Sequence, residues 1–141
     1  MNHLLLYLLL FGAAIGVILA AEKPNIIFVL FDDMGYGEPS SYRAESPFRT
    51  PNLNRLGRDG MRFTDAHAPA SCCTPSRYGF LTGRYPFRIN QFGVLNTYSQ
   101  PLIPPERMTV ASFLKAQGYH TACIGKWHLG QREEFMPTSH G

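Results

Sequence analysis

The feature that most constrains the fold is a short apolar run near the N-terminus. Residues 26–31 read Ile-Ile-Phe-Val-Leu-Phe, without the polar residue at every second position that a half-exposed strand would show. A strand that is apolar on both faces is typical of a parallel sheet covered by helices on each side. The run ends at Asp32-Asp33, before a glycine-containing turn. The sequence therefore predicts a buried strand with two carboxylates at its carboxyl end.

Helices and further strands alternate along the rest of the chain. Thr50-Pro51 has the pattern of an N-cap followed by a proline in the first helical turn, so we expect a helix that ends near Gly57 or Gly60. We expect further helices over residues 74–83 and 109–117, and further strands over 61–68 and 119–125. Val110, Phe113 and Leu114 form the expected buried stripe of the third helix. The alternation predicts an α/β fold, as the N-terminal part of a large sheet covered by helices on both faces.

The first twenty residues have the pattern of a targeting segment. Residues 4–19 are almost wholly apolar, and Ala20-Ala21 provides a small-residue exit before the charged Glu22. We interpret residues 1–20 as a secretory signal peptide and residues 22–141 as the start of the mature catalytic domain. A retained membrane anchor is the alternative, because the apolar run is nearly long enough to span a bilayer. After cleavage, no stable membrane insertion is expected, and the protein would be secreted or periplasmic, or lysosomal in a eukaryote.

Composition excludes several functional classes. The formal charge is only +3 over 141 residues, and the basic residues are scattered, so no nucleic-acid partner is expected. The three cysteines are too few, and odd in number, for a disulfide framework. Their spacing does not suit zinc either. One of the adjacent Cys72 and Cys73 is left as a candidate for special chemistry.

Asp32 and Asp33 form the first candidate site. Ligands of α/β proteins bind beyond the carboxyl ends of the strands, and adjacent carboxylates repel each other unless a cation lies between them. Hard oxygen ligands suit calcium or magnesium. The alternative is a solvated turn without a metal.

The second candidate site is the segment that runs from Cys73 to Arg77. Pro75 suits the first turn of a helix, which puts Cys73 at or just before the helix N-terminus. Unsatisfied N–H groups and the helix dipole at that end attract an anion and activate a thiol. Arg77, one turn further on, can hold two oxygens of a tetrahedral anion. The alternative is a buried structural cysteine with a surface arginine.

Lys126 and His128 form the third candidate site. In an extended chain their side chains would point the same way, at the end of the last expected strand. Lysine would bind an anion, and histidine would transfer a proton near neutral pH. The alternative is a solvated lysine beside an ordinary core tryptophan.

Five blocks of this sequence, in order, resemble the sulfatase family of the alkaline-phosphatase-like superfamily. Residues 73–77 match its C-x-P-S-R signature, and residues 81–84 match the usual continuation. The other matching blocks are residues 32–37, 50–53 and 125–130. The stretch Glu38-Pro39-Ser40 departs from the Asp and glycine-rich continuation that the family often has.

The resemblance implies a sulfuric ester hydrolase. Cys73 would be converted to formylglycine by a separate maturation enzyme, whereas Cys72 does not fit the signature. Asp32, Asp33 and the modified Cys73 would hold calcium, in preference to magnesium. Arg77, Lys126 and His128 would be catalytic, binding the sulfate and the formylglycine oxygens. The implied substrate is a sulfate ester, either an aryl sulfate or a sulfated carbohydrate.

Three other functions stay open at this point. The first is a phosphatase or phosphonate monoester hydrolase on the same scaffold. The second is a binding protein with a degenerate site, and the third is a plain secreted α/β domain with a free thiol. In each case we expect the domain to be incomplete at its C-terminal end. Residues 22–141 alone are expected to be inactive and poorly folded, because two or three parallel strands cannot be covered by the helices present.

Overall fold

The computed structural model describes residues 23–96 and 99–141. The chain divides into two units, Met1–Leu30 and Phe31–Gly141. The expected signal peptide lies outside the described residues, and within the first unit only residues 23–30 are described. No helix in the described ranges is long and apolar enough to cross a membrane.

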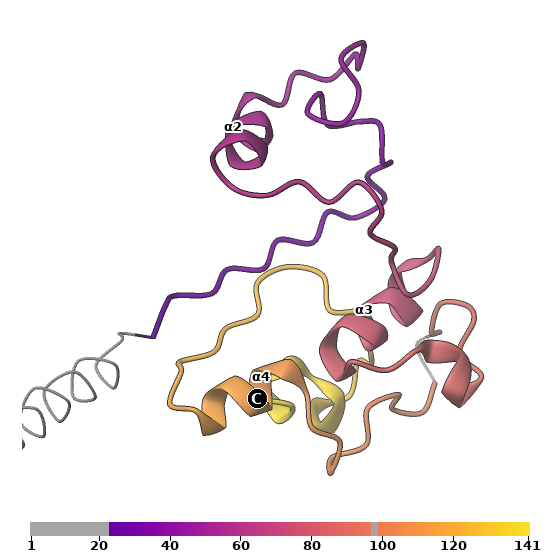
Figure 1. The fold of residues 1–141 in the computed structure, drawn as a ribbon. Coiled ribbons are helices and arrows are strands. Elements are labelled where there is room, and N and C mark those ends of the chain that lie inside the picture. The colour runs from indigo at the N-terminus through magenta and orange to yellow at the C-terminus, as the bar shows by residue number, and fades with distance from the viewer. Residues whose placement is uncertain (1–22, 97–98) are drawn as a thin grey trace, which may run out of the picture. The chain divides into compact units, whose positions relative to one another are not determined.

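The second unit contains short helices joined by long loops (Figure 1). The α-helices are α2 (Pro51–Asp59), α3 (Cys73–Thr82) and α4 (Val110–Ala116). Three 3₁₀ turns accompany them: η1 (Pro86–Ile89), η2 (Glu133–Phe135) and η3 (Pro137–Ser139).

All three expected helices are present, and local signals set their ends. In α2, Pro51 occupies the first turn, where its missing N–H removes no helical hydrogen bond. In α3, Gly83 ends the helix in the left-handed conformation, with φ of 65°. In α4, Thr109 and Ser112 form a reciprocal capping box, so two otherwise unpaired backbone N–H groups are satisfied.

The expected strands are wrong for this structure. Residues 26–31, 61–68 and 119–125 lie outside any regular element, and the described ranges hold no strand. A strand exists only through hydrogen bonds to a neighbour, and residues 23–96 and 99–141 offer these segments no strand to pair with. Their apolar side chains are accordingly exposed: Ile27 by 87%, Met61 by 76% and Ile124 by 97%.

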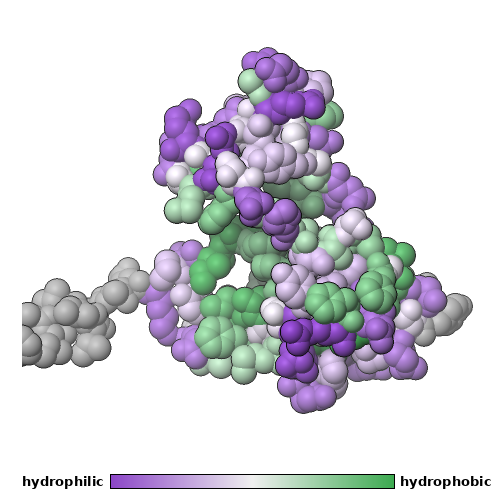
Figure 2. Space-filling model, turned by 45° about the vertical axis from the view of Figure 1, so that its right-hand side comes forward, coloured by the Kyte–Doolittle hydropathy of each residue, from purple (hydrophilic) through white to green (hydrophobic). Residues whose placement is uncertain are grey.

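The buried stripe expected on α4 is also wrong. Val110 and Phe113 are exposed, and Leu114 is only half-buried. The stripe needs a sheet to cover it, and the described residues provide none. Hydrophobic side chains consequently lie at the surface of the molecule in several places (Figure 2).

A small core nevertheless fixes the part of the chain that matters for function. Tyr78 of α3, Ile103 and Leu129 are buried against one another. Leu81, Leu102 and Trp127 pack around them as partly buried neighbours. Burying a large apolar side chain stabilises a fold by about 1.5–3 kcal/mol. This core therefore anchors α3 to the segment that carries Lys126 and His128.

Candidate active site

The first part of the candidate site is the N-terminus of α3. Cys73 is the first helical residue, and Cys72 is the N-cap in an extended conformation. The Ser76 N–H donates to the Cys72 carbonyl at 3.2 Å, which closes the first turn. The Ser76 hydroxyl donates to the carbonyl of Ala70 at 2.7 Å and ties the preceding loop to the helix. The predicted position of Cys73 at a helix N-terminus is thus confirmed.

The two adjacent cysteines face different neighbours. The Cys72 sulfur lies 3.6 Å from the carbonyl oxygen of Phe92. The Cys73 sulfur lies 3.1 Å from Nδ1 of His128. Only Cys73 is therefore in contact with another sequence-predicted site residue through its sulfur.

The second part of the site is a bend, where the sequence led us to expect the end of a strand. His128 has φ of 61°, in the left-handed region, and the flanking Gly125 and Gly130 have φ of 101° and 142°. The Trp127 side chain stabilises the bend, because its Nε1 donates a hydrogen bond to the Phe135 carbonyl at 2.7 Å. Lys126 and His128 do lie together at the site, as expected. The reason is the bend, however, and not the alternation of side chains along an extended strand.

Asp32 joins the two parts electrostatically. Its Oδ2 lies 2.8 Å from Nζ of Lys126, and its Oδ1 lies 3.4 Å from Nη2 of Arg77. The other terminal nitrogen of Arg77 donates to the Lys126 carbonyl. The Arg77 side chain is 12% exposed, whereas those of Asp32 and Lys126 are 44% and 42% exposed. Solvent screens exposed ion pairs, so this cluster orients charges more than it stabilises the fold.

The contacts also set the protonation of the cluster. The hydrogen bond from Lys126 lowers the pKa of Asp32, and the nearby charges of Lys126 and Arg77 act in the same direction, against partial desolvation. The hydrogen bond to Asp32 in turn raises the pKa of Lys126. At neutral pH Asp32 is therefore ionised and Lys126 is protonated.

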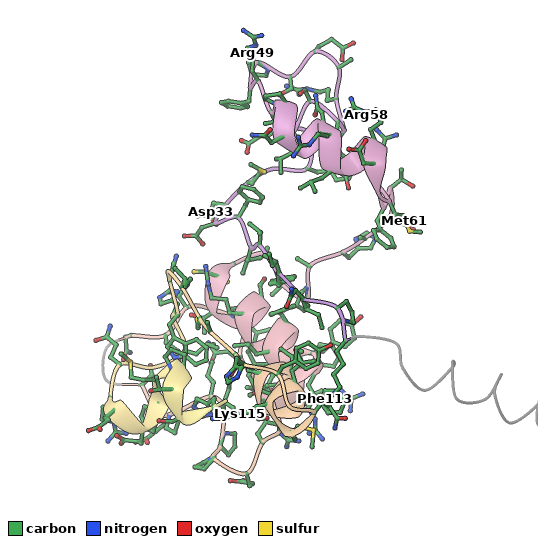
Figure 3. The ribbon with its side chains drawn as sticks, turned by 90° about the vertical axis from the view of Figure 1, so that its left-hand side faces the viewer. Asp33, Arg49, Arg58, Met61, Phe113 and Lys115 are labelled. Carbon is green, nitrogen blue, oxygen red and sulfur yellow. The ribbon has the colours of Figure 1, made fainter. Side chains whose placement is uncertain are left out.

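The fit to a divalent cation rests on the carboxylates. Asp32 and Asp33 offer hard oxygens of the kind that calcium prefers, and Asp33 extends its carboxylate away from the ribbon (Figure 3). Calcium takes six to eight oxygen ligands, more than two carboxylates can supply. Within residues 23–96 and 99–141 there is no group of three His, Cys, Asp or Glu that could hold a metal. The two aspartates could therefore supply only part of a cation site, and both oxygens of Asp32 face the cationic side chains of Arg77 and Lys126.

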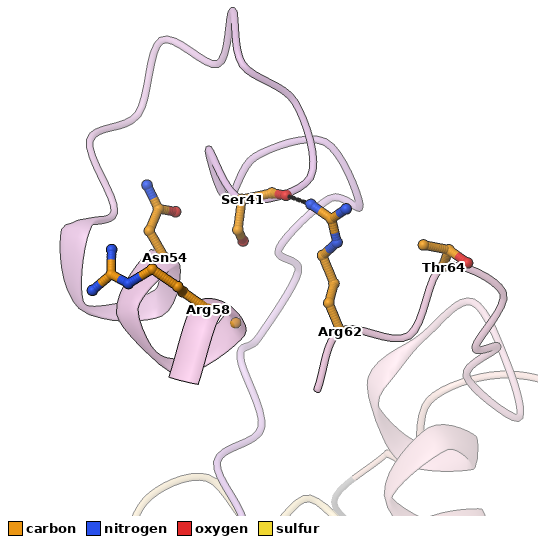
Figure 4. Close-up of a pocket in the computed structure, with 6 residues that line it drawn as sticks. Ser41, Asn54, Arg58, Arg62 and Thr64 are labelled. Atoms are coloured by element: carbon orange, nitrogen blue, oxygen red, sulfur yellow. Dashed lines mark hydrogen bonds between the residues drawn. The ribbon is translucent and has the colours of Figure 1, made fainter. Parts of the chain in front are cut away.

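A separate polar pocket of about 550 Å³ lies beside α2 (Figure 4). Arg62 of this pocket donates to the carbonyl of Ser41. None of the sequence-predicted site residues lines it. Its lining residues are Ser41, Asn54, Gly57, Arg58, Arg62 and Thr64.

Sequence reasoning missed one residue of the site, Thr74. Its side chain is fully buried, and its hydroxyl touches His128. Position 74 is the variable place in the C-x-P-S-R pattern, so no sequence signal pointed to it.

Comparison with known proteins finds similarity over most of the chain. The sulfatase family model matches residues 24–140. Arylsulfatase A of Bos taurus is 48% identical over 125 residues, which cover 86% of this chain and 24% of the relative. Human steryl-sulfatase is 48% identical over 117 residues, covering 79% of this chain and 20% of the relative. The N-acetylgalactosamine-6-O-sulfatase of Bacteroides thetaiotaomicron is 44% identical over 110 residues, covering 78% and 21%.

Solved structures extend the similarity to the fold. The structure of Ps i-CgsB matches with a TM-score of 0.78 at 34% identity, covering 85% of this chain and 27% of that one. A structure from work on glycosaminoglycan metabolism by Bacteroides thetaiotaomicron matches with a TM-score of 0.70 at 43% identity, covering 78% and 23%. Both have the alkaline-phosphatase-like fold expected from the sequence. The chain spans about a quarter of the length of the relatives it matches.

Proposed function

This chain belongs to the sulfatase family, and from that premise we propose that the protein hydrolyses sulfate esters with a formylglycine made from Cys73. The observation that carries the proposal is the meeting of two segments far apart in sequence. Cys73 at the start of α3 contacts His128 at 3.1 Å. The side chains of Arg77 and Lys126, from the same two segments, both contact the Asp32 carboxylate. Two cations, a histidine and a helix N-terminus suit the tetrahedral, negatively charged sulfate group of an ester and a nucleophile at residue 73.

The nucleophile requires a modification of Cys73. A separate maturation enzyme would oxidise the thiol to the aldehyde of formylglycine, which hydrates to a gem-diol. One hydroxyl loses its proton as its oxygen attacks the sulfur of the ester, the bond from sulfur to the ester oxygen breaks, and the ester oxygen takes up a proton as the alcohol leaves. The second hydroxyl then loses its proton, the bond from carbon to the sulfate oxygen breaks, and the aldehyde is restored. An unmodified thiol lacks the second hydroxyl and would keep the sulfuryl group.

The surrounding residues take the roles that their chemistry allows. Arg77 holds the gem-diol through its planar fork, and Lys126 binds a sulfate oxygen as a point charge. His128 is within reach of residue 73 to hold or move a proton at Nδ1. The N-terminus of α3 directs its positive end at the same place.

Asp32 and Asp33, with an oxygen of formylglycine 73, would hold a divalent cation, calcium in preference to magnesium. A bound cation would polarise the sulfate oxygens as a Lewis acid. The cations beside Asp32 lower its pKa, so this carboxylate stays ionised across the neutral range.

The relatives' names support a sulfate ester as substrate, either an aryl sulfate or a sulfated carbohydrate. The relatives reported above are named as sulfatases of aryl, steryl or N-acetylgalactosamine-6-sulfate substrates. A solved neighbour is a complex with k-i-k-neocarrahexaose. These names do not favour the alternative of a phosphatase or phosphonate hydrolase. With residues 1–20 as signal peptide, the protein would act outside the cytoplasm, as a secreted, periplasmic or lysosomal enzyme.

The test uses the whole protein co-expressed with a formylglycine-generating maturation enzyme. Turnover of an aryl sulfate and of the matching aryl phosphate is measured in parallel for the wild type, Cys73→Ala and Cys72→Ala. We expect the sulfate to be preferred, Cys73→Ala to be inactive and Cys72→Ala to keep most of its activity. A dead Cys72→Ala beside an active Cys73→Ala would refute the assignment, and a preference for the phosphate would favour the alternative.

A further inference from the structure

One buried hydroxyl joins the two segments of the candidate site. The Thr74 side chain is 0% exposed, although it carries a polar group. Its hydroxyl donates to the His128 carbonyl oxygen at 3.1 Å and accepts from the Leu95 N–H at 3.2 Å. His128 Nδ1 lies 3.4 Å from the same oxygen. Because a hydroxyl has one proton and two lone pairs, these three partners can all be satisfied at once.

The residue that Thr74 contacts is one whose backbone needs support. His128 has φ of 61°, a conformation that is disfavoured for a residue with a Cβ and persists only where its surroundings impose it. One constraint is the burial of the next residue, Leu129, in the core. The other is the hydrogen bond from Thr74 to the carbonyl of His128 itself.

The same hydroxyl orients the imidazole. Its only proton goes to the carbonyl, so it presents a lone pair to Nδ1 of His128. That nitrogen also faces the Cys73 sulfur at 3.1 Å. A hydroxyl acceptor beside Nδ1 favours the tautomer with its proton on that nitrogen.

We propose that Thr74 is a positioning residue that holds the bend at His128 and aims its imidazole at residue 73. The inference rests on the proposed function, since its effect is on the formylglycine that Cys73 would become. Thr74 need not touch the substrate. It acts through His128, and its role depends on the hydroxyl.

The test compares Thr74→Val with Thr74→Ser in the whole protein. Valine keeps the branched shape and removes the hydroxyl, whereas serine keeps the hydroxyl. Position 74 lies inside the signature, so the converted fraction of Cys73 is measured by mass spectrometry and every rate is expressed per formylglycine. A small misplacement of a catalytic group costs up to about 100-fold in rate. We expect Thr74→Val to lower kcat about 10- to 100-fold with little change in KM, and Thr74→Ser to restore kcat to near the wild-type value.

Thr109→Val is the matched control. Thr109 is also buried, and its hydroxyl donates to a backbone carbonyl, that of His140 at 2.6 Å. It caps α4 and contacts none of the proposed site residues, so kcat per formylglycine should stay at the wild-type value even if the melting temperature falls.

Three results would overturn the proposal. The first is a Thr74→Val protein with wild-type kcat per formylglycine, and the second is a Thr74→Ser protein as slow as the valine variant. If Thr74→Val does not fold, Thr74→Ala serves as a smaller variant without the hydroxyl. The third result is the failure of both Thr74→Val and Thr74→Ala to fold, which would assign the hydroxyl to stability instead. A wild type that carries formylglycine but hydrolyses no aryl sulfate would refute the proposed function separately, before any variant is compared.

Discussion

Gly130 is a position at which one added methyl group should disturb the candidate site. It follows the bend that carries Lys126 and His128, and its φ is 142°. A Cβ at residue 130 would lie 2.5 Å from Cβ of Phe135. Phe135 is buried, and its Cβ is attached directly to the backbone of η2. It therefore cannot move aside by changing rotamer.

Gly130→Ala consequently has two separate costs. The backbone conformation costs about 1–3 kcal/mol for a residue with a side chain. Overpacking against Phe135 costs about 1–3 kcal/mol more. We expect the free energy of unfolding to fall by about 2–6 kcal/mol, and kcat to fall as well because the bend must shift to relieve the contact.

Two other glycines separate these costs. Gly125 has φ of 101° but nothing within 4 Å of an added Cβ, so Gly125→Ala should show the backbone cost alone. Gly93 has neither a left-handed φ nor a neighbour within 4 Å. Gly93→Ala should stay within about 0.5 kcal/mol of the wild type.

Denaturant unfolding and aryl sulfate turnover of the three variants, made in the whole protein, provide the assay. The expected order of stability is Gly93→Ala, then Gly125→Ala, then Gly130→Ala as the least stable. A Gly130→Ala protein as stable as Gly125→Ala would refute the close packing of the bend against Phe135.

The remaining predictions concern the two aspartates, the exposed apolar side chains and one buried histidine. Asp32→Asn and Asp33→Asn should each weaken calcium binding in titration calorimetry and sharply lower turnover; full activity after chelation would contradict the metal assignment. Residues 22–141 expressed alone should show no aryl sulfate turnover and no cooperative thermal unfolding, because apolar side chains such as Ile27 and Ile124 are exposed; a cooperative transition with turnover would contradict this. Burial lowers the pKa of His140, so as the pH falls the unfolded state binds a proton at this residue before the folded state does. The free energy of unfolding should therefore decrease as the pH drops from the ordinary histidine pKa towards the lower folded-state pKa. His140→Gln should remove part of this pH dependence in denaturant unfolding measured over a pH series.

The helices could be predicted because their signals are local. Proline in the first turn marks α2, the glycine after Thr82 ends α3, and Thr109 caps α4. The placement of Cys73 at a helix N-terminus followed from Pro75 two residues later. Each of these signals acts within one turn and needs no distant partner.

The strands and the bend could not be predicted in the same way. An apolar run such as residues 26–31 becomes a strand only when a neighbouring strand pairs with it, and no such pairing exists among the described residues. The left-handed φ of His128 is imposed by contacts with Thr74 and with the core. The contact between Thr74 and His128 joins residues 54 positions apart, so no local pattern reveals it.

The central claim is that Cys73 becomes the nucleophile, and mass spectrometry of one peptide tests it most directly. The whole protein is purified after co-expression with the maturation enzyme and digested, and the peptide that contains both Cys72 and Cys73 is sequenced by fragmentation. We predict an aldehyde at residue 73, with a mass below that of the thiol, an unmodified thiol at residue 72, and aryl sulfate turnover that rises in proportion to the converted fraction. Turnover by protein in which residue 73 remains a thiol, or an aldehyde at residue 72 instead, would contradict the account.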